Sequence, residues 1–105
     1  MIFSIVFSKQ AEDDLKGIFE YISISLQAIE NAIGQLDRLE KSILGLQEMP
    51  KRFPQYKREP WKSRGLRMMP VDNYIVYYIP NEVTQTITIV RVMYAGRNIT
   101  EQLEK

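Results

Sequence analysis

The sequence contains no cysteine and no histidine among its 105 residues. Without cysteine, disulfides and thiolate metal ligands are excluded, and a reducing compartment such as the cytoplasm suits the chain best. Without histidine, the commonest general base and the commonest metal ligand are both missing. The five glycines are scattered and form no phosphate-binding loop. We therefore expect no cofactor and no metal, and few classes of enzyme remain.

Long hydrophobic runs are also missing. The apolar start, Met1 to Phe7, lacks a positively charged residue and is far too short for a signal peptide or a membrane span. We expect it to form a β-strand, and we expect no membrane partner. The length is that of one domain, residues 1–105.

Positive and negative charges are distributed unevenly. Residues 1–48 carry four basic and eight acidic side chains, whereas residues 49–105 carry ten basic and five acidic ones. Seven of those ten lie between Lys51 and Arg67, where only Glu59 opposes them. This asymmetry predicts an acidic or polyanionic partner, with a solvated loop as the alternative.

Hydrophobic periodicity predicts two consecutive helices. Ser8 can cap a first helix that runs from about Lys9 to Ser25, with apolar residues at three- and four-residue spacing. A second apolar stripe begins at Ile29 and ends before Pro50. The short connection makes the two helices antiparallel neighbours, which is a helical hairpin.

Three extended segments follow a proline-rich loop, and turn residues between them predict antiparallel pairing. The segments run from Gly65 to Val71, Tyr74 to Ile79 and Thr86 to Tyr94. The fold class is therefore α+β, with an N-terminal strand and a helical hairpin packed on an antiparallel β-sheet. Both faces of the central strands are apolar, but the helices can cover only one. We expect the other face, apart from a short C-terminal segment, to be an uncovered partner site.

The side chains that remain for binding or catalysis are arginine, lysine and tyrosine, which can bind phosphates and stabilise developing negative charge. Arg91 interrupts an apolar strand, so we expect it to face away from the helical hairpin. In the loop, Phe53 and Trp61 are expected to pin the chain to the core. The four cations expected to bind an acidic surface there, nucleic acid or another protein, are Lys57, Arg58, Lys62 and Arg64.

The chain resembles the RelE/ParE superfamily of toxins from bacterial type II toxin-antitoxin systems. The resemblance rests on the order and spacing of short segments: residues 7–8, 11–15, 18, 21–22, 36–39, 49–50, 65–67, 69–71, 73–78 and 89–99. It implies a helical hairpin on an antiparallel sheet, growth arrest, and neutralisation by a cognate antitoxin in a toxin-antitoxin hetero-oligomer.

Two branches of that family differ in their target. The ParE-like branch poisons DNA gyrase, and the RelE-like branch cleaves mRNA on the ribosome. Ile75 stands where the ribonuclease branch often has an arginine, and the segment from Arg91 to Asn98 is similar to the ParE-like ending. The resemblance therefore favours a gyrase inhibitor that is not an enzyme, with Arg91 and Arg97 as further binding residues.

The alternatives stay open on sequence alone. A metal-independent endoribonuclease would use Arg67, Arg91, Tyr94 and Arg97 as its catalytic set. A non-toxic interaction module would use the same fold to bind some other chain.

Overall fold

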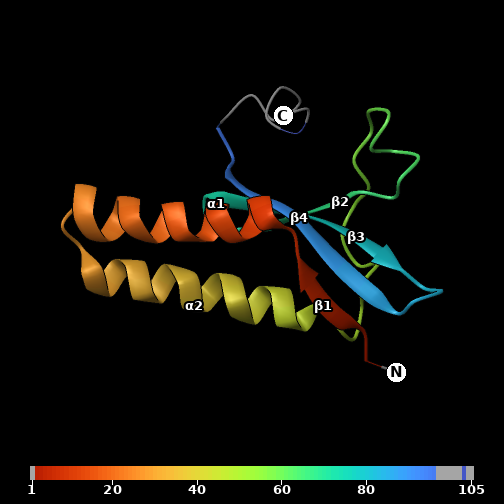
Figure 1. Cartoon of the computed structure of the whole chain (residues 1–105), viewed down its shortest axis with the longest axis horizontal. Helices are drawn as coiled ribbons and strands as arrows, with labels where there is room; N and C mark the ends of the chain where they lie inside the picture. The colour runs from red at the N-terminus through yellow and green to blue at the C-terminus, as the bar shows by residue number, and fades with distance from the viewer. Residues whose placement is uncertain (1, 97–102, 104–105) are drawn as a thin grey trace.

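The computed structural model describes residues 2–96 and residue 103. Its elements are β1 (Ser4–Phe7), α1 (Lys9–Glu20), the π-helical segment η1 (Tyr21–Ser25), α2 (Ile29–Gly45), β2 (Arg67–Val71), β3 (Tyr74–Asn81) and β4 (Thr86–Tyr94). The two helices lie side by side along one side of a twisted sheet (Figure 1). The predicted α+β fold is confirmed.

The helical hairpin begins at the predicted cap. The Ser8 hydroxyl accepts a hydrogen bond from the Ala11 backbone N–H at 3.0 Å and donates one to the Val90 carbonyl at 2.7 Å. One serine therefore starts α1 and ties that start to β4. The helix widens into η1 over the segment predicted as its last turn, and Gln27 turns the chain with a φ of 53°.

The sheet has the strand order β1-β4-β3-β2. Strands β2, β3 and β4 form the predicted antiparallel meander, whereas β1 pairs with β4 in parallel, with Ser4 opposite Thr86 and Phe7 opposite Ile89. The strand β1 is therefore an edge strand whose outer side has no neighbour in the described sheet. A bulge between Tyr77 and Tyr78 shifts the β3–β4 register.

The main core lies between the helical hairpin and one face of the sheet. It is built from fully buried aliphatic side chains of α2, β3 and β4, among them Leu39, Val76 and Ile89, together with Tyr78. The apolar helix stripes and the inward set of strand residues meet here, as their periodicity predicted.

The opposite face of the sheet carries a second apolar cluster. Tyr77 and Met93 are buried there under Tyr56 and Leu66 of the loop and under Leu103. The loop is tied to β2 because the Met68 backbone N–H donates to the Pro54 carbonyl at 3.0 Å. The expectation of an uncovered sheet face is therefore wrong, because the proline-rich loop folds back over the strands.

The two loop aromatics behave as predicted. Phe53 packs against the main core and Trp61 against the second cluster. Within residues 2–96, no helix is long and apolar enough to cross a bilayer.

Candidate functional site

The segment from Lys51 to Arg67, called the basic segment below, projects from the end of the sheet away from the turn of the helical hairpin (Figure 1). Its four predicted binding residues are all exposed: Lys57, Arg58, Lys62 and Arg64. None of the four forms an ion pair with a carboxylate in the part of the chain that the structure describes. Four unneutralised cations therefore share one loop.

Backbone hydrogen bonds fix the shape of this loop. The Lys62 N–H donates to the Arg58 carbonyl at 2.8 Å, and the N–H groups of Arg64 and Leu66 both donate to the Trp61 carbonyl at 3.1 Å. Gly65 completes the turn with a φ of 82°, a left-handed conformation that glycine adopts without strain. The cations are thus presented on a folded loop with a defined shape.

The only acidic residue of the basic segment is occupied by the loop itself. The Glu59 carboxylate accepts hydrogen bonds from the Ser63 backbone N–H at 2.8 Å and from the Ser63 hydroxyl at 2.7 Å. These bonds, with a smaller contribution from the charge of Lys62, lower the pKa of Glu59 below its ordinary value. Glu59 therefore stays ionised but is held by Ser63.

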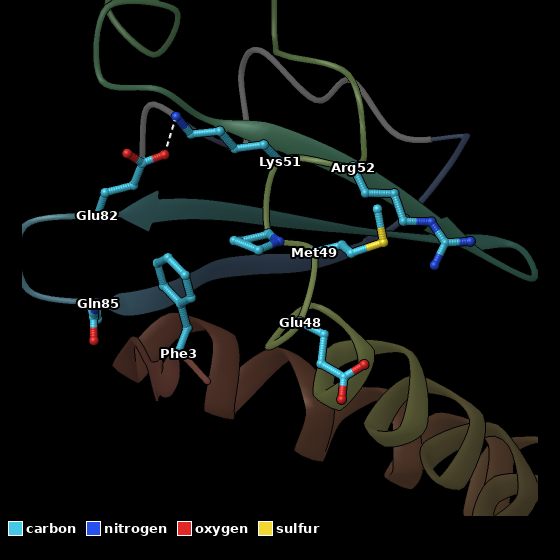
Figure 2. Close-up of a pocket in the computed structure, with 8 residues that line it drawn as sticks. Phe3, Glu48, Met49, Lys51, Arg52, Glu82 and Gln85 are labelled. Atoms are coloured by element: carbon cyan, nitrogen blue, oxygen red, sulfur yellow. Dashed lines mark ion pairs between the residues drawn. The ribbon is translucent and has the colours of Figure 1, made fainter. Parts of the chain in front are cut away.

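The beginning of the basic segment lines a pocket of about 680 Å³ with Phe3, which precedes β1, and with the β3–β4 turn. Figure 2 shows Lys51 extending to Glu82 across its upper side and Phe3 and Met49 on its walls. Lys51 is thus paired with Glu82, unlike the cations farther along the loop.

Arg67 ends the basic segment and links it to the sheet. Its Nη1 donates to the Phe53 carbonyl at 2.6 Å and to the Lys51 carbonyl at 3.2 Å. The guanidinium therefore holds the start of the loop against β2.

Arg91 contacts the helical hairpin, contrary to expectation. Its Nε and Nη2 donate to the two carboxylate oxygens of Asp14 on α1 at 2.8 and 2.9 Å. The Val92 backbone N–H donates to the same carboxylate at 2.9 Å. The prediction that Arg91 faces away from the hairpin is wrong because β1 ends at Phe7, which leaves the edge of β4 open to α1 beyond that point.

The Asp14–Arg91 pair is nearly buried, with side-chain exposures of 14% and 13%. The hydrogen bonds that the Arg91 guanidinium donates to Asp14 raise its pKa above the ordinary value. A bidentate pair of this kind fixes the position of both side chains. The one sequence signal for this pair was Arg91, a lone arginine in an apolar strand.

Tyr94 lies at the end of β4 and lines a pocket of about 590 Å³ together with Asp14 of α1 and Tyr21 of η1. Its ring stands edge-on to Tyr74 with centroids 5.8 Å apart, and about half of the residue is exposed. Burial, and to a smaller extent the neighbouring tyrosines, raise the pKa of Tyr74 above its ordinary value.

The predicted catalytic set is thus only partly brought together. Arg91 and Tyr94 lie three residues apart on β4, whereas Arg67 lies two strands away on β2 and is bonded to loop carbonyls. Arg97 lies outside the described residues. The assignment of these four residues to catalysis stays a prediction.

An apolar groove of about 550 Å³ separates β1 from the helical hairpin. Its walls include Ile5 and Phe7 of β1, Leu15 of α1, and Leu36 and Leu44 of α2. Several of these side chains are partly exposed, and the groove runs beside the open edge of the sheet. Among the described residues, no group of three acidic side chains could hold a metal ion.

Comparisons with known proteins agree with this architecture. A family model described as the ParE toxin of the type II toxin-antitoxin system parDE matches residues 5–99. No curated protein sequence matches the chain significantly.

Three solved structures illustrate the likeness of fold. A chain of the chromosomal ParDE system from P. aeruginosa has a TM-score of 0.71 at 18% identity, covering 89% of this chain and 96% of that chain. A mutant of the E. coli toxin RelE in the free state has a TM-score of 0.69 at 11% identity, covering 97% and 93%. A chain of a RelBE toxin-antitoxin complex from Mycobacterium tuberculosis has a TM-score of 0.62 at 19% identity, covering 90% and 99%.

At these identities the structural matches show the fold alone, whereas the family model spans all the helices and strands except the first residue of β1. The chain therefore belongs to the ParE toxin family of type II toxin-antitoxin systems.

Proposed function

We propose that this toxin acts in the bacterial cytoplasm by binding DNA gyrase, and that a cognate antitoxin neutralises it. One observation supports gyrase as the target, the match of residues 5–99 to the ParE family model. The ParE-like branch is the one for which the resemblance implies gyrase. On this proposal the toxin inhibits through protein contacts, and its own side chains break no bond in a nucleic acid.

The chemistry of the described site supports an inhibitor. The guanidinium of Arg67 donates to backbone carbonyls and that of Arg91 to Asp14, so both have protein acceptors in place of a substrate phosphate. The chain has no histidine to move a proton near neutral pH.

Two assays run side by side test the target. In a supercoiling assay, purified toxin should block gyrase or trap cleaved DNA in a dose-dependent way. In a translation reaction analysed by primer extension, the message should remain whole. Unimpaired supercoiling together with discrete cuts in the message would contradict the gyrase assignment.

The ribonuclease alternative depends on Tyr94, which is exposed beside the pocket that α1 and β4 form. If the toxin cuts mRNA, Tyr94→Phe should abolish cutting without unfolding the chain. Tyr21→Phe is the matched control, because Tyr21 lines the same pocket and is similarly exposed. Variants at Arg91 are less useful here, because they also remove the contact with Asp14.

We place the antitoxin on the apolar groove between β1 and the helical hairpin. Related structures are described as toxin-antitoxin complexes, and this groove presents apolar side chains next to an unpaired strand edge. An exposed apolar surface of this kind fits a protein partner that adds a strand or packs a helix.

The groove assignment has a direct test in co-expression with the short protein encoded beside the toxin gene. Leu44→Glu places a charge in the groove and should weaken complex formation and its protection from growth arrest. Val83→Glu is the control, because Val83 is 95% exposed in the β3–β4 turn. Equal protection against the unchanged toxin, Leu44→Glu and Val83→Glu would show that the antitoxin does not bind in this groove.

Expression of this chain by itself distinguishes a toxin from a non-toxic interaction module. Induction of this chain without its antitoxin should stop growth. Normal growth at high soluble expression would favour the interaction module.

A further inference from the structure

The cations from residue 57 to residue 64 differ from the other basic side chains of the described structure. Outside residues 57–64, most basic side chains that the structure describes are paired with a carboxylate: Lys9 with Asp13, Arg38 with Asp72, Lys41 with Asp37, Lys51 with Glu82 and Arg91 with Asp14. In the loop from residue 57 to residue 64, four exposed cations have no such partner in the described structure. The one carboxylate available to them, that of Glu59, is held by Ser63.

The loop also lacks what a protein partner normally contacts. Protein interfaces are built around buried aromatic or aliphatic anchors. The large exposed apolar side chains of the described chain lie in or near β1, on the helical hairpin, at Met49, at Val83 in the β3–β4 turn and at Tyr94. None lies between Lys51 and Arg67. An interface made by this loop would therefore be almost purely electrostatic.

Single-stranded nucleic acids are a poor fit for a related reason. Recognition of unpaired bases uses exposed aromatic rings as stacking platforms. Here Tyr56 is buried beneath the loop, and Trp61 packs on the second cluster with the Arg64 guanidinium 5.0 Å from its ring centre. The aromatic residues of the loop serve as anchors, and its exposed side chains are cations, prolines, uncharged polar residues and Glu59.

We propose that Lys57, Arg58, Lys62 and Arg64 bind the phosphate backbone of duplex DNA, without reading its sequence. Interfaces with duplex DNA are polar, strongly positive and dominated by phosphate contacts, which is what this loop offers. Its shape is fixed by backbone hydrogen bonds before binding, so little conformational freedom is lost. The inference concerns the free toxin and does not depend on the gyrase assignment.

Fluorescence anisotropy of a labelled duplex of mixed sequence, titrated with the full chain, tests the proposal. With about four phosphate contacts, the logarithm of the binding constant should fall with the logarithm of salt concentration with a slope of about −3.6. Binding should therefore weaken about 100-fold between about 50 and 200 mM salt. A slope between about −1 and 0, or no binding at low salt, would overturn the proposal.

Two matched triple variants separate the loop from overall charge. K57Q/R58Q/K62Q removes three loop cations, and K9Q/K16Q/K41Q removes three exposed cations of the helical hairpin. The loop variant should reduce the slope to about −0.9, and the hairpin variant should leave it near the original value. Circular dichroism checks that both variants are folded.

Three results would overturn the assignment. Equal weakening by both triple variants would show a non-specific effect of net charge. Tighter binding of single-stranded RNA than of the duplex would make RNA the ligand. Loss of antitoxin binding in the loop variant, with DNA binding unchanged, would make the loop a protein interface.

Discussion

Replacing Asp14 by asparagine should destabilise the toxin far more than the same change at the preceding residue. The Asp14 carboxylate accepts two hydrogen bonds from the Arg91 guanidinium and one from the Val92 N–H, and both charged side chains are nearly buried. Asparagine keeps the size and one acceptor oxygen but removes the negative charge. The negative charge that faces the Arg91 guanidinium is then lost at a poorly hydrated site.

The magnitude follows from the burial of the pair. Removing one partner of a buried ion pair costs about 3–5 kcal/mol, and we take the lower end because some solvent still reaches both side chains. A loss of about 3 kcal/mol should lower the Tm by roughly 10–20 °C in a domain of this size. Asp13→Asn should cost about 0.5 kcal/mol or less, because Asp13 and Lys9 form an exposed pair within one helix.

Urea denaturation of the single and double variants measures the effect. Asp14→Asn combined with Arg91→Met removes both charges and should recover most of the stability lost by Asp14→Asn, with a coupling free energy of about 2 kcal/mol. Unfolding free energies for Asp14→Asn and Asp13→Asn that agree within about 0.5 kcal/mol, or a coupling near zero, would refute the reasoning.

Two neighbouring tyrosines and one turn carboxylate give further predictions. The Tyr78 hydroxyl donates to the Pro50 carbonyl at 2.7 Å, whereas the buried Tyr77 hydroxyl has no partner in the described structure. In urea denaturation, Tyr78→Phe should therefore lower the free energy of unfolding by about 1 kcal/mol, and Tyr77→Phe should leave it unchanged. Equal losses would contradict this. Hydrogen bonding from Arg38 lowers the pKa of Asp72, so its stabilising contribution should persist above pH 3.8 and disappear only as the pH falls through the depressed value. An NMR titration should show this pKa rising in Arg38→Gln, and an unchanged value would remove Arg38 as its cause.

Local patterns were sufficient to predict the helices and the antiparallel meander. The cap at Ser8 and the apolar spacing of the two helices act over a few residues, and the structure follows both. The parallel pairing of β1 with β4 was not predicted, because Ser4 and Thr86 are brought together only by the packing of the whole domain. The bulge at Tyr77 likewise depends on how β4 packs.

The candidate site was harder to predict, because its contacts join distant parts of the chain. The Asp14 and Arg91 side chains meet across 77 positions, and their types alone are compatible with a capping acid and a surface arginine. The cover over Tyr77 depends on the loop folding back so that Tyr56 and Leu66 become buried. Proline and charge patterns marked that loop correctly but contained no information on which sheet face it covers.

Plasmid topology in arrested cells tests the central claim most directly. The toxin is induced without its antitoxin, and plasmid DNA is separated by supercoil density while the same cells provide RNA for primer extension. We predict growth arrest with relaxed or cleaved plasmid and intact messages, because gyrase activity is lost first. Growth arrest with normal negative supercoiling and messages cut at discrete positions would contradict the account.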